Sequence, residues 1–211
     1  MKLNLPNSAY VNKFIPKSKF YERVTLSAKL QKEFVGKIQR ITWKYKLSEE
    51  TIGISKTENV TEIQIFEVEL KEQKIPQNVL KVIDRTIPYQ ILYIFTYNGN
   101  TAYGITLKEN NSVQNYYFSE WNDDIHFDFT GIDLEKVYQK LIKAFLADEL
   151  QKKENFNEII EHDTKIKTLE KEVATLENRI RKQKQFNRKV ETNKELLKKK
   201  KELKMLKRNL L

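Results

Sequence analysis

The 211-residue sequence contains no cysteine and only two histidines, His126 and His162. The missing thiols exclude a disulfide framework, thiol catalysis and any zinc or iron–sulfur site with cysteine ligands. No apolar run reaches the ~20 residues that a membrane span needs, and the first residues lack the pattern of a signal peptide. We therefore expect no cofactor, no metal, no membrane partner and a cytoplasmic location.

Glycine and proline are scarce, and all five glycines and four prolines lie in residues 1–131. Because these residues are the main helix breakers, residues 132–211 are free to form very long helices. Both tryptophans and all ten tyrosines lie before residue 140, so the large aromatic side chains of a core are found there. We predict a globular domain over residues 1–150 and a helical extension over residues 151–211.

Negative charge is in short supply, and the deficit lies in the C-terminal part. The chain has 39 Lys+Arg against 29 Asp+Glu, a net charge of +10. Residues 132–211 hold 22 basic and 14 acidic residues, a net of +8, which leaves 17 and 15, a net of +2, for residues 1–131. The basic character of the protein therefore belongs to the extension.

A helix is predicted after Ser27, which is a suitable N-cap residue. Apolar side chains then recur in steps of three and four residues up to Leu47, which is the pattern of one face of an amphipathic helix. They are Leu30, Phe34, Ile38, Ile41 and Tyr45.

The next patterns predict strands and short helices. Residues 62–71 alternate as a strand does, and residues 77–86 form a helix that ends before Pro88. Residues 91–97 and 101–107 flank Asn98-Gly99, which favours the positive φ angles of a tight hairpin. Asp133 caps a further helix. The fold class is therefore α/β (α+β), with a small mixed sheet followed by a long helical coiled coil.

Apolar residues of the extension follow a heptad pattern with steps of three and four. They are Ile166, Leu169, Val173, Leu176 and Ile180. A single helix cannot bury such a narrow stripe, so it needs a second copy of the chain, another protein or the returning half of the extension. We expect a homo-oligomer formed through these residues.

The heptad pattern breaks near residue 183, because its continuation would bury Gln183 and Asn187. A new apolar series starts at Phe186. The break is either a stutter in one continuous helix or the turn of a helical hairpin. No glycine or proline marks a turn, so the sequence favours a continuous helix.

Residues 179–208 contain 14 Lys+Arg and only three acidic residues, which is typical of a surface that binds polyanions. Few aromatic side chains are available for base stacking, so we expect contacts with the DNA or RNA backbone. The alternative is a solvated flank of a coiled coil. The candidate nucleic-acid-binding residues are Arg179, Arg181, Lys182, Lys184, Arg188, Lys189, Lys198, Lys199, Lys200 and Lys201.

One strand carries a candidate catalytic motif. Glu67, Glu69 and Lys71 share one face of the strand over residues 62–71, and Glu69-Leu70-Lys71 has the spacing of restriction-type nuclease sites. In such sites a carboxylate holds a divalent metal and the lysine steadies the attacking water. The chemistry also needs an upstream acidic ligand, for which Glu58 is the nearest candidate. The motif is also common on exposed strands, where the charges are merely solvated.

Four separate stretches resemble an uncharacterised bacterial family catalogued only as a domain of unknown function. They are IPKSKFY at 15–21, ITWKYKLS at 41–48, VLKVIDRTIPY at 79–89 and KQFNRKVETN at 184–193. Members of that family tend to be encoded beside helicases and DNA methyltransferases in restriction or anti-phage clusters. The resemblance therefore implies a DNA-handling context and a helicase or DNA methyltransferase as partner, and it implies no catalytic residue.

Three functions remain open from the sequence. The favoured one is a non-catalytic accessory subunit of a bacterial DNA-modification or antiviral defence system. The second is a metal-dependent nuclease that uses Glu67, Glu69 and Lys71. The third is a purely structural coiled-coil assembly protein.

Overall fold

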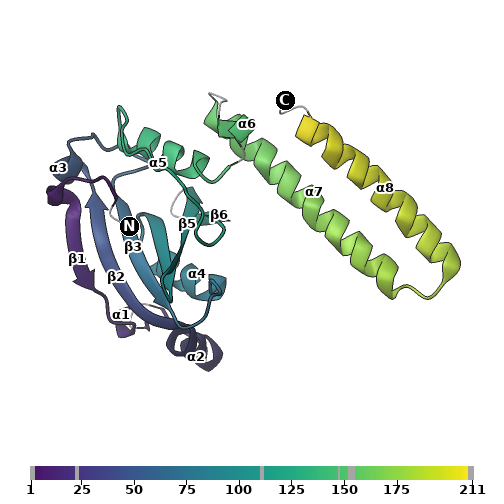
Figure 1. Cartoon of the computed structure of the whole chain (residues 1–211), viewed down its shortest axis with the longest axis horizontal. Helices are drawn as coiled ribbons and strands as arrows, with labels where there is room; N and C mark the ends of the chain where they lie inside the picture. Colours follow the sequence, from purple (N-terminus) through teal and green to yellow (C-terminus); the bar gives the residue numbers. More distant parts are fainter. Residues whose placement is uncertain (1–2, 22–23, 110–111, 147, 152–154, 209–211) are drawn as a thin grey trace. The chain divides into compact units, whose positions relative to one another are not determined.

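A six-stranded sheet organises the first part of the chain (Figure 1). The structure is a computed structural model that describes residues 3–21, 24–109, 112–146, 148–151 and 155–208. The strands pair in sequence order, and all pairs are antiparallel except β3 and β4, which are parallel because helix α4 connects them. The strands are β1 (Tyr10–Phe14), β2 (Ile38–Leu47), β3 (Ile63–Leu70), β4 (Gln90–Tyr97), β5 (Asn100–Glu109) and β6 (Ser112–Phe118).

The chain divides into two compact units, Met1–Phe145 and Leu146–Leu211, where the sequence predicted a boundary between residues 150 and 151. The first unit contains the sheet, a 3-10 turn and helices α1 to α5. The second contains helices α6 to α8. Their bounds are η1 (Asn7–Ala9), α1 (Ser18–Tyr21), α2 (Ala28–Lys37), α3 (Glu49–Ile52), α4 (Gln77–Thr86), α5 (Leu134–Lys143), α6 (Asp148–Gln151), α7 (Phe156–Lys182) and α8 (Phe186–Arg208).

Both faces of the sheet are buried in the first unit. One face carries Phe66 and Val68 of β3, which lie in a cluster with α4 and with Phe34 of α2. Ile63 and Ile65 alternate with those residues, so they point to the other face, and they are fully buried as well. A sheet covered on both faces is expected for the parallel pair β3 and β4.

Several local predictions are confirmed. Asn98 and Gly99 adopt φ angles of 45° and 83° between β4 and β5, as a tight hairpin requires. Ser27 accepts a hydrogen bond from the Leu30 amide, and Asp133 accepts one from the Lys136 amide, so both cap their helices. The mixed α/β class is likewise confirmed.

The helix predicted to run to Leu47 is wrong in its second half. Helix α2 ends at Lys37, and Ile38–Leu47 is strand β2. Two shifts of register, between Ile38 and Arg40 and between Trp43 and Tyr45, interrupt the two-residue alternation of this strand. Such bulges let residues three or four positions apart share a face, so Ile38 and Ile41 both join the core cluster and imitate a helical pattern.

The continuous helix predicted for the extension is also wrong. Helices α7 and α8 are separate and pack against each other as a hairpin joined by residues 183–185 (Figure 1). Gln183 leaves the helix with an extended backbone, φ −75° and ψ 124°. None of residues 183–185 adopts a positive φ, so the turn does not require glycine. The break in the apolar pattern was the signal of the turn.

The described helices include none with both the length and the apolar character required to cross a lipid bilayer.

Candidate functional site

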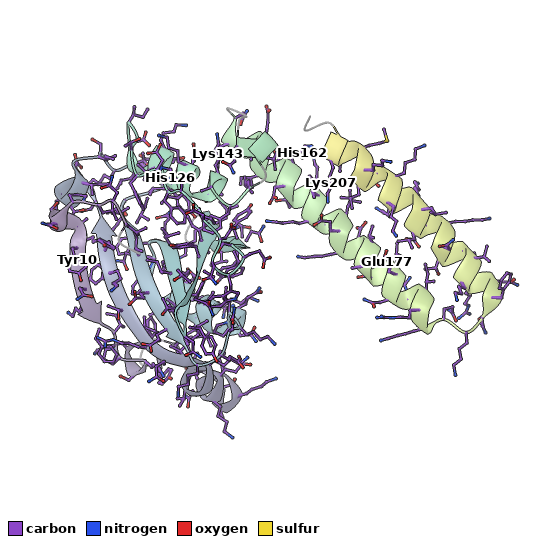
Figure 2. All side chains as sticks on the ribbon, viewed as in Figure 1. Tyr10, His126, Lys143, His162, Glu177 and Lys207 are labelled. Atoms are coloured by element: carbon purple, nitrogen blue, oxygen red, sulfur yellow. The ribbon has the colours of Figure 1, made fainter. Side chains whose placement is uncertain are left out.

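The two long helices of the second unit are connected by charged side chains as well as by apolar ones. Glu177 of α7 and Lys207 of α8 mark the two ends of this contact (Figure 2). Three ion pairs join acidic residues of α7 to lysines of α8: Glu172 to Lys199 at 2.8 Å, Glu177 to Lys200 at 2.7 Å and Glu170 to Lys207 at 2.7 Å. Glu170 lies seven residues before Glu177 on α7, whereas its partner Lys207 lies seven residues after Lys200 on α8, so the helices are antiparallel.

The heptad stripe of α7 lies inside this hairpin. Ile166, Leu169 and Leu176 are buried, whereas Val173 and Ile180 are half-buried. Thr192 and Leu196 are the buried residues of α8. The returning half of the extension therefore covers much of the stripe, and oligomerisation through it stays a prediction.

The ten basic residues predicted to bind nucleic acid fall into two groups. Lys198, Lys199, Lys200 and Lys201 lie within α8, where Lys199 and Lys200 are held by ion pairs and Lys198 and Lys201 are exposed. The Glu172 carboxylate raises the pKa of Lys199. The other six surround the turn between the helices, and we call residues 178–190 the hairpin tip. They are Arg179, Arg181, Lys182, Lys184, Arg188 and Lys189.

The residues of the candidate nuclease motif lie at the end of β3 without an acidic neighbour on β2. Arg40 is the register partner of Glu69, and Lys44 forms an ion pair with Glu67 at 3.3 Å. Lys71 follows the strand. Within the described part of the chain, no three or more His, Asp or Glu side chains are grouped so that they could hold a metal ion. Glu58 precedes the first residue of β3, whereas Glu69 lies near the last, so Glu58 is not placed to be the second acidic metal ligand. The nuclease interpretation stays a prediction.

Glu67 and Lys44 also line a groove of about 530 Å³ on the first unit. Tyr10, Tyr45 and Ile94 form much of its remaining wall. The groove therefore presents one ion pair beside aromatic and apolar surface.

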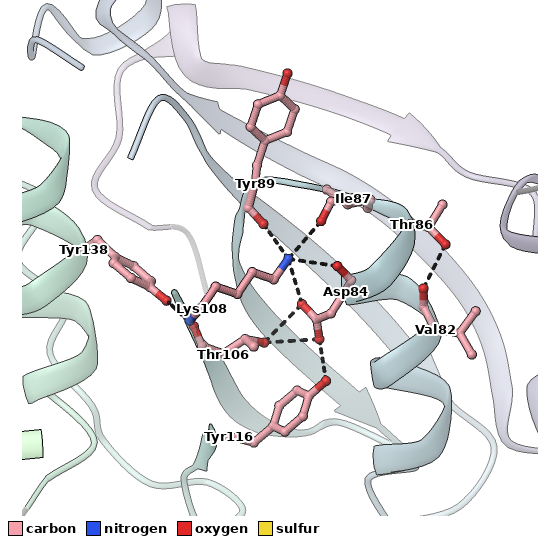
Figure 3. A network of polar contacts seen from close by, with 9 residues as sticks. All are labelled: Val82, Asp84, Thr86, Ile87, Tyr89, Thr106, Lys108, Tyr116 and Tyr138. Carbon is pink, nitrogen blue, oxygen red and sulfur yellow. Dashed lines mark hydrogen bonds and ion pairs between the residues drawn. The ribbon is translucent and has the colours of Figure 1, made fainter. Parts of the chain in front are cut away.

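Sequence reasoning missed a buried polar network that connects α4 to β5 and β6 (Figure 3). Lys108 lies 3.3 Å from the Asp84 carboxylate, and these side chains are 1% and 0% exposed. The Asp84 carboxylate also accepts hydrogen bonds from the hydroxyls of Thr106, at 3.2 Å, and Tyr116, at 2.7 Å. Burial raises the pKa of Asp84, and the positive charge of Lys108 opposes that shift.

Lys108 additionally closes the C-terminal end of α4. Its ammonium group donates to the carbonyl oxygens of Asp84, Ile87 and Tyr89 at 3.1, 2.9 and 2.7 Å. A cation at this end of a helix also interacts favourably with the helix dipole. The only hint in the sequence was a single aspartate among the apolar residues of 79–87, and its lysine lies 24 residues away.

A family model described as Domain of unknown function (DUF4391) matches residues 3–203. The chain belongs to this family. The DUF4391 match spans both units, so the helical hairpin and the sheet are parts of one family domain. The Asp84 network and the hairpin tip both lie within the matched residues. No curated protein and no solved structure matches the chain.

Proposed function

We propose that this DUF4391 protein is a non-catalytic accessory subunit of a bacterial DNA-modification or anti-phage defence system, and that its α7–α8 hairpin binds nucleic-acid backbone. One observation carries the proposal, the unequal charge of the two helices. Helix α7 has six basic and six acidic residues, whereas α8 has ten basic and three acidic residues. The ion pairs between the helices use only part of the excess on α8.

The uncompensated lysines of α8 face solvent. Lys194, Lys198 and Lys201 are exposed, and they recur at steps of four and three, which places them on one side of the helix. Each phosphate that such a lysine neutralises releases counterions and strengthens binding at low salt. The same three side chains take part in no ion pair among the described residues, so folding leaves their charge available.

The hairpin also offers surface to a protein partner. Leu197 and Met205 of α8 are 59% and 57% exposed, and Met205 lines a shallow groove between the helices beside Leu169 and Leu206. We propose that a helix of a partner enzyme, a helicase or DNA methyltransferase in the context that the family resemblance implies, or a second copy of the chain completes a coiled coil there. In this proposal the first unit provides a second surface that contacts the partner.

Binding of fluorescently labelled duplex and single-stranded oligonucleotides to the full chain, measured at several salt concentrations, tests the backbone contact. For a duplex, we expect the slope of log K against log salt to become about 0.9 less negative for each lost phosphate contact. The variant Lys198→Gln/Lys201→Gln should therefore reduce the slope by about two. Lys29→Gln/Lys32→Gln, which removes two exposed lysines of α2, is the matched control and should change nothing.

Three results contradict the proposal. Binding that is absent at low salt would favour a purely structural assembly protein. Equal loss in the control variant would mean that net charge alone matters. Mg²⁺-dependent cleavage of DNA that disappears in Lys71→Ala would replace the accessory role with that of a nuclease.

A further inference from the structure

The hairpin tip combines positive charge with an exposed aromatic ring. Residues 178–190 contain six basic residues and no acidic residue, so the nearest carboxylates in the sequence are those of Glu177 and Glu191. Figure 1 shows the turn at the end of the hairpin far from α6. The flanking Glu177 is already paired with Lys200, so its charge is not available to the tip.

The six cations of the tip are not neutralised by carboxylates within the described part of the chain. All six are exposed, and none forms an ion pair with another described residue. Arg181 donates a hydrogen bond to the side chain of Asn178, which is neutral. Lys199, Lys200 and Lys207 further along α8 behave differently, since each pairs with an acidic residue of α7.

The position of two of these cations opposes helix stability. Basic residues at the end of α7 suit the negative end of its dipole, so folding alone accounts for Arg179, Arg181 and Lys182. Arg188 and Lys189, however, are among the first four residues of α8, where the dipole is positive and where no residue is acidic, since Glu191 follows only in the next turn. Folding gives no reason for cations at this place, whereas a bound anion does.

Phe186 begins α8, and the residue is 77% exposed. This exposure shows that the ring does not close the hairpin, whose buried residues on α8, Thr192 and Leu196, lie further along the helix. Val190, one turn later on the same side, is also partly exposed at 38%. A ring held in solvent between basic residues is the arrangement with which proteins stack on unpaired bases while they hold the backbone.

We propose that the hairpin tip binds single-stranded nucleic acid, with Phe186 stacked on an unpaired base and Arg188 and Lys189 on the adjacent phosphates. The inference rests on the proposed function and narrows it to a substrate class. Bases of a duplex are already stacked on each other, so a single exposed ring finds no free face there.

The test compares four labelled 20-nucleotide probes with the full chain: oligo-dT, oligo-U, a duplex and an abasic strand that keeps its phosphates but has no bases. Loss of one stacked base corresponds to about a five- to 150-fold change in affinity. We expect Phe186→Ala to weaken binding of one or both of the first two probes by a factor in this range. The same variant should leave the duplex and the abasic strand unaffected, and Phe186→Trp should restore binding.

Val35→Ala is the matched control, because it removes an exposed apolar side chain from helix α2 of the first unit, which takes no part in the proposed site, and it should not alter binding. Helical circular dichroism checks that each variant keeps the hairpin. Equal affinity of wild type and Phe186→Ala for oligo-dT and oligo-U overturns the inference but not the proposed function. An equal loss on the abasic strand has the same meaning. If the wild-type chain binds none of the probes, both the inference and the proposed nucleic-acid contact fail.

Discussion

Lys108 is an unusual residue, because a lysine whose side chain is 1% exposed has lost nearly all contact with water. Its charge is tolerated because the Asp84 carboxylate and three carbonyl oxygens surround its ammonium group. Desolvation nevertheless lowers the pKa of Lys108, and the Asp84 carboxylate works against that shift. A buried pair of this kind contributes little net stability, but breaking it from one side is costly.

We predict that Lys108→Met lowers the free energy of unfolding by about 3–5 kcal/mol at pH 7, because the Asp84 carboxylate is left buried without a cation. Its pKa then lies well above the unfolded value of about 3.9, so stability is retained below that pH and lost as the pH rises through the folded pKa. Urea unfolding at pH 4 and pH 7 measures this difference.

Two further variants control for the Lys108→Met measurement. Asp84→Asn/Lys108→Met should lose the additional difference between pH 4 and pH 7 that Lys108→Met shows, since the amide cannot ionise. Lys81→Met, at an exposed position of α4, should change stability by no more than about 0.5 kcal/mol. A Lys108→Met variant that is equally stable at both pH values would contradict an ionised Asp84.

We expect a second dependence of stability on pH, which comes from Asp128 at the surface. The Lys140 ammonium at 2.7 Å, followed by hydrogen bonds from Thr130, lowers the pKa of Asp128 to about 2. The interaction therefore stabilises the fold above the unfolded pKa of about 3.9 and is lost as the pH falls towards 2. Both side chains are about half exposed, so the contribution is at most about 1 kcal/mol. Asp128→Asn should flatten this part of an acid-unfolding curve, and an unchanged curve would contradict it.

At the scale of elements, α8 departs most from what helix stability alone requires. Its first turn contains Arg188 and no acidic residue. Its contact with α7 uses two buried side chains and three ion pairs, and the remaining surface is basic. Removing cations from the positive end of a helix dipole stabilises the helix. Their presence in α8 is therefore a cost in stability, which binding of an anion would explain.

We predict that Arg188→Gln stabilises the hairpin and that Arg188→Glu stabilises it more, by about 0.3–1 kcal/mol. Each substitution moves the charge of the first turn of α8 towards the negative charge that the helix dipole favours there. Both variants should weaken binding of single-stranded oligonucleotides in the same order. Thermal melting followed by helical circular dichroism and a binding titration measure the two effects. Lys194→Gln, outside the first turn, is the control for the dipole effect. A loss of stability in Arg188→Glu would mean that this arginine serves the fold.

At the scale of the whole molecule, the two units differ in how they are stabilised. Unit Met1–Phe145 has a sheet with apolar residues buried on both faces and contains both tryptophans. Unit Leu146–Leu211 is mainly two helices, of 27 and 23 residues, with a narrow apolar contact. We expect the helical unit to unfold first.

Because of this difference, we expect the Leu176→Ala variant to unfold in two separate thermal transitions, one for each unit. Removing that buried side chain from the contact of α7 with α8 costs about 2–5 kcal/mol. The loss of helical circular dichroism should move to lower temperature, while the fluorescence of Trp43 and Trp121 should melt as in the wild type. Leu197→Ala, at an exposed position, should alter neither signal. A common shift of both signals would contradict independent units.

Features determined by the local sequence could be predicted. Helix α4 lies between Pro76 and Pro88. The helix caps at Ser27 and Asp133 and the Asn98-Gly99 hairpin likewise depend on residues within a few positions of each other. The division into an aromatic-rich part and a basic helical part follows from composition, because cores need large apolar side chains and helices exclude glycine and proline. The basic surface was equally visible, since net charge does not depend on the fold.

Features that depend on distant residues were decided only by the tertiary structure. Bulges against β3 make Ile38–Leu47 a strand although its apolar spacing imitates a helix. The Asp84 network joins residues of α4, β5 and β6 that no local pattern connects. The extension folds back on itself because burying the stripe of α7 against α8 in the same chain requires no second molecule. These outcomes depend on long-range burial and charge pairing, which spacing along a chain does not encode.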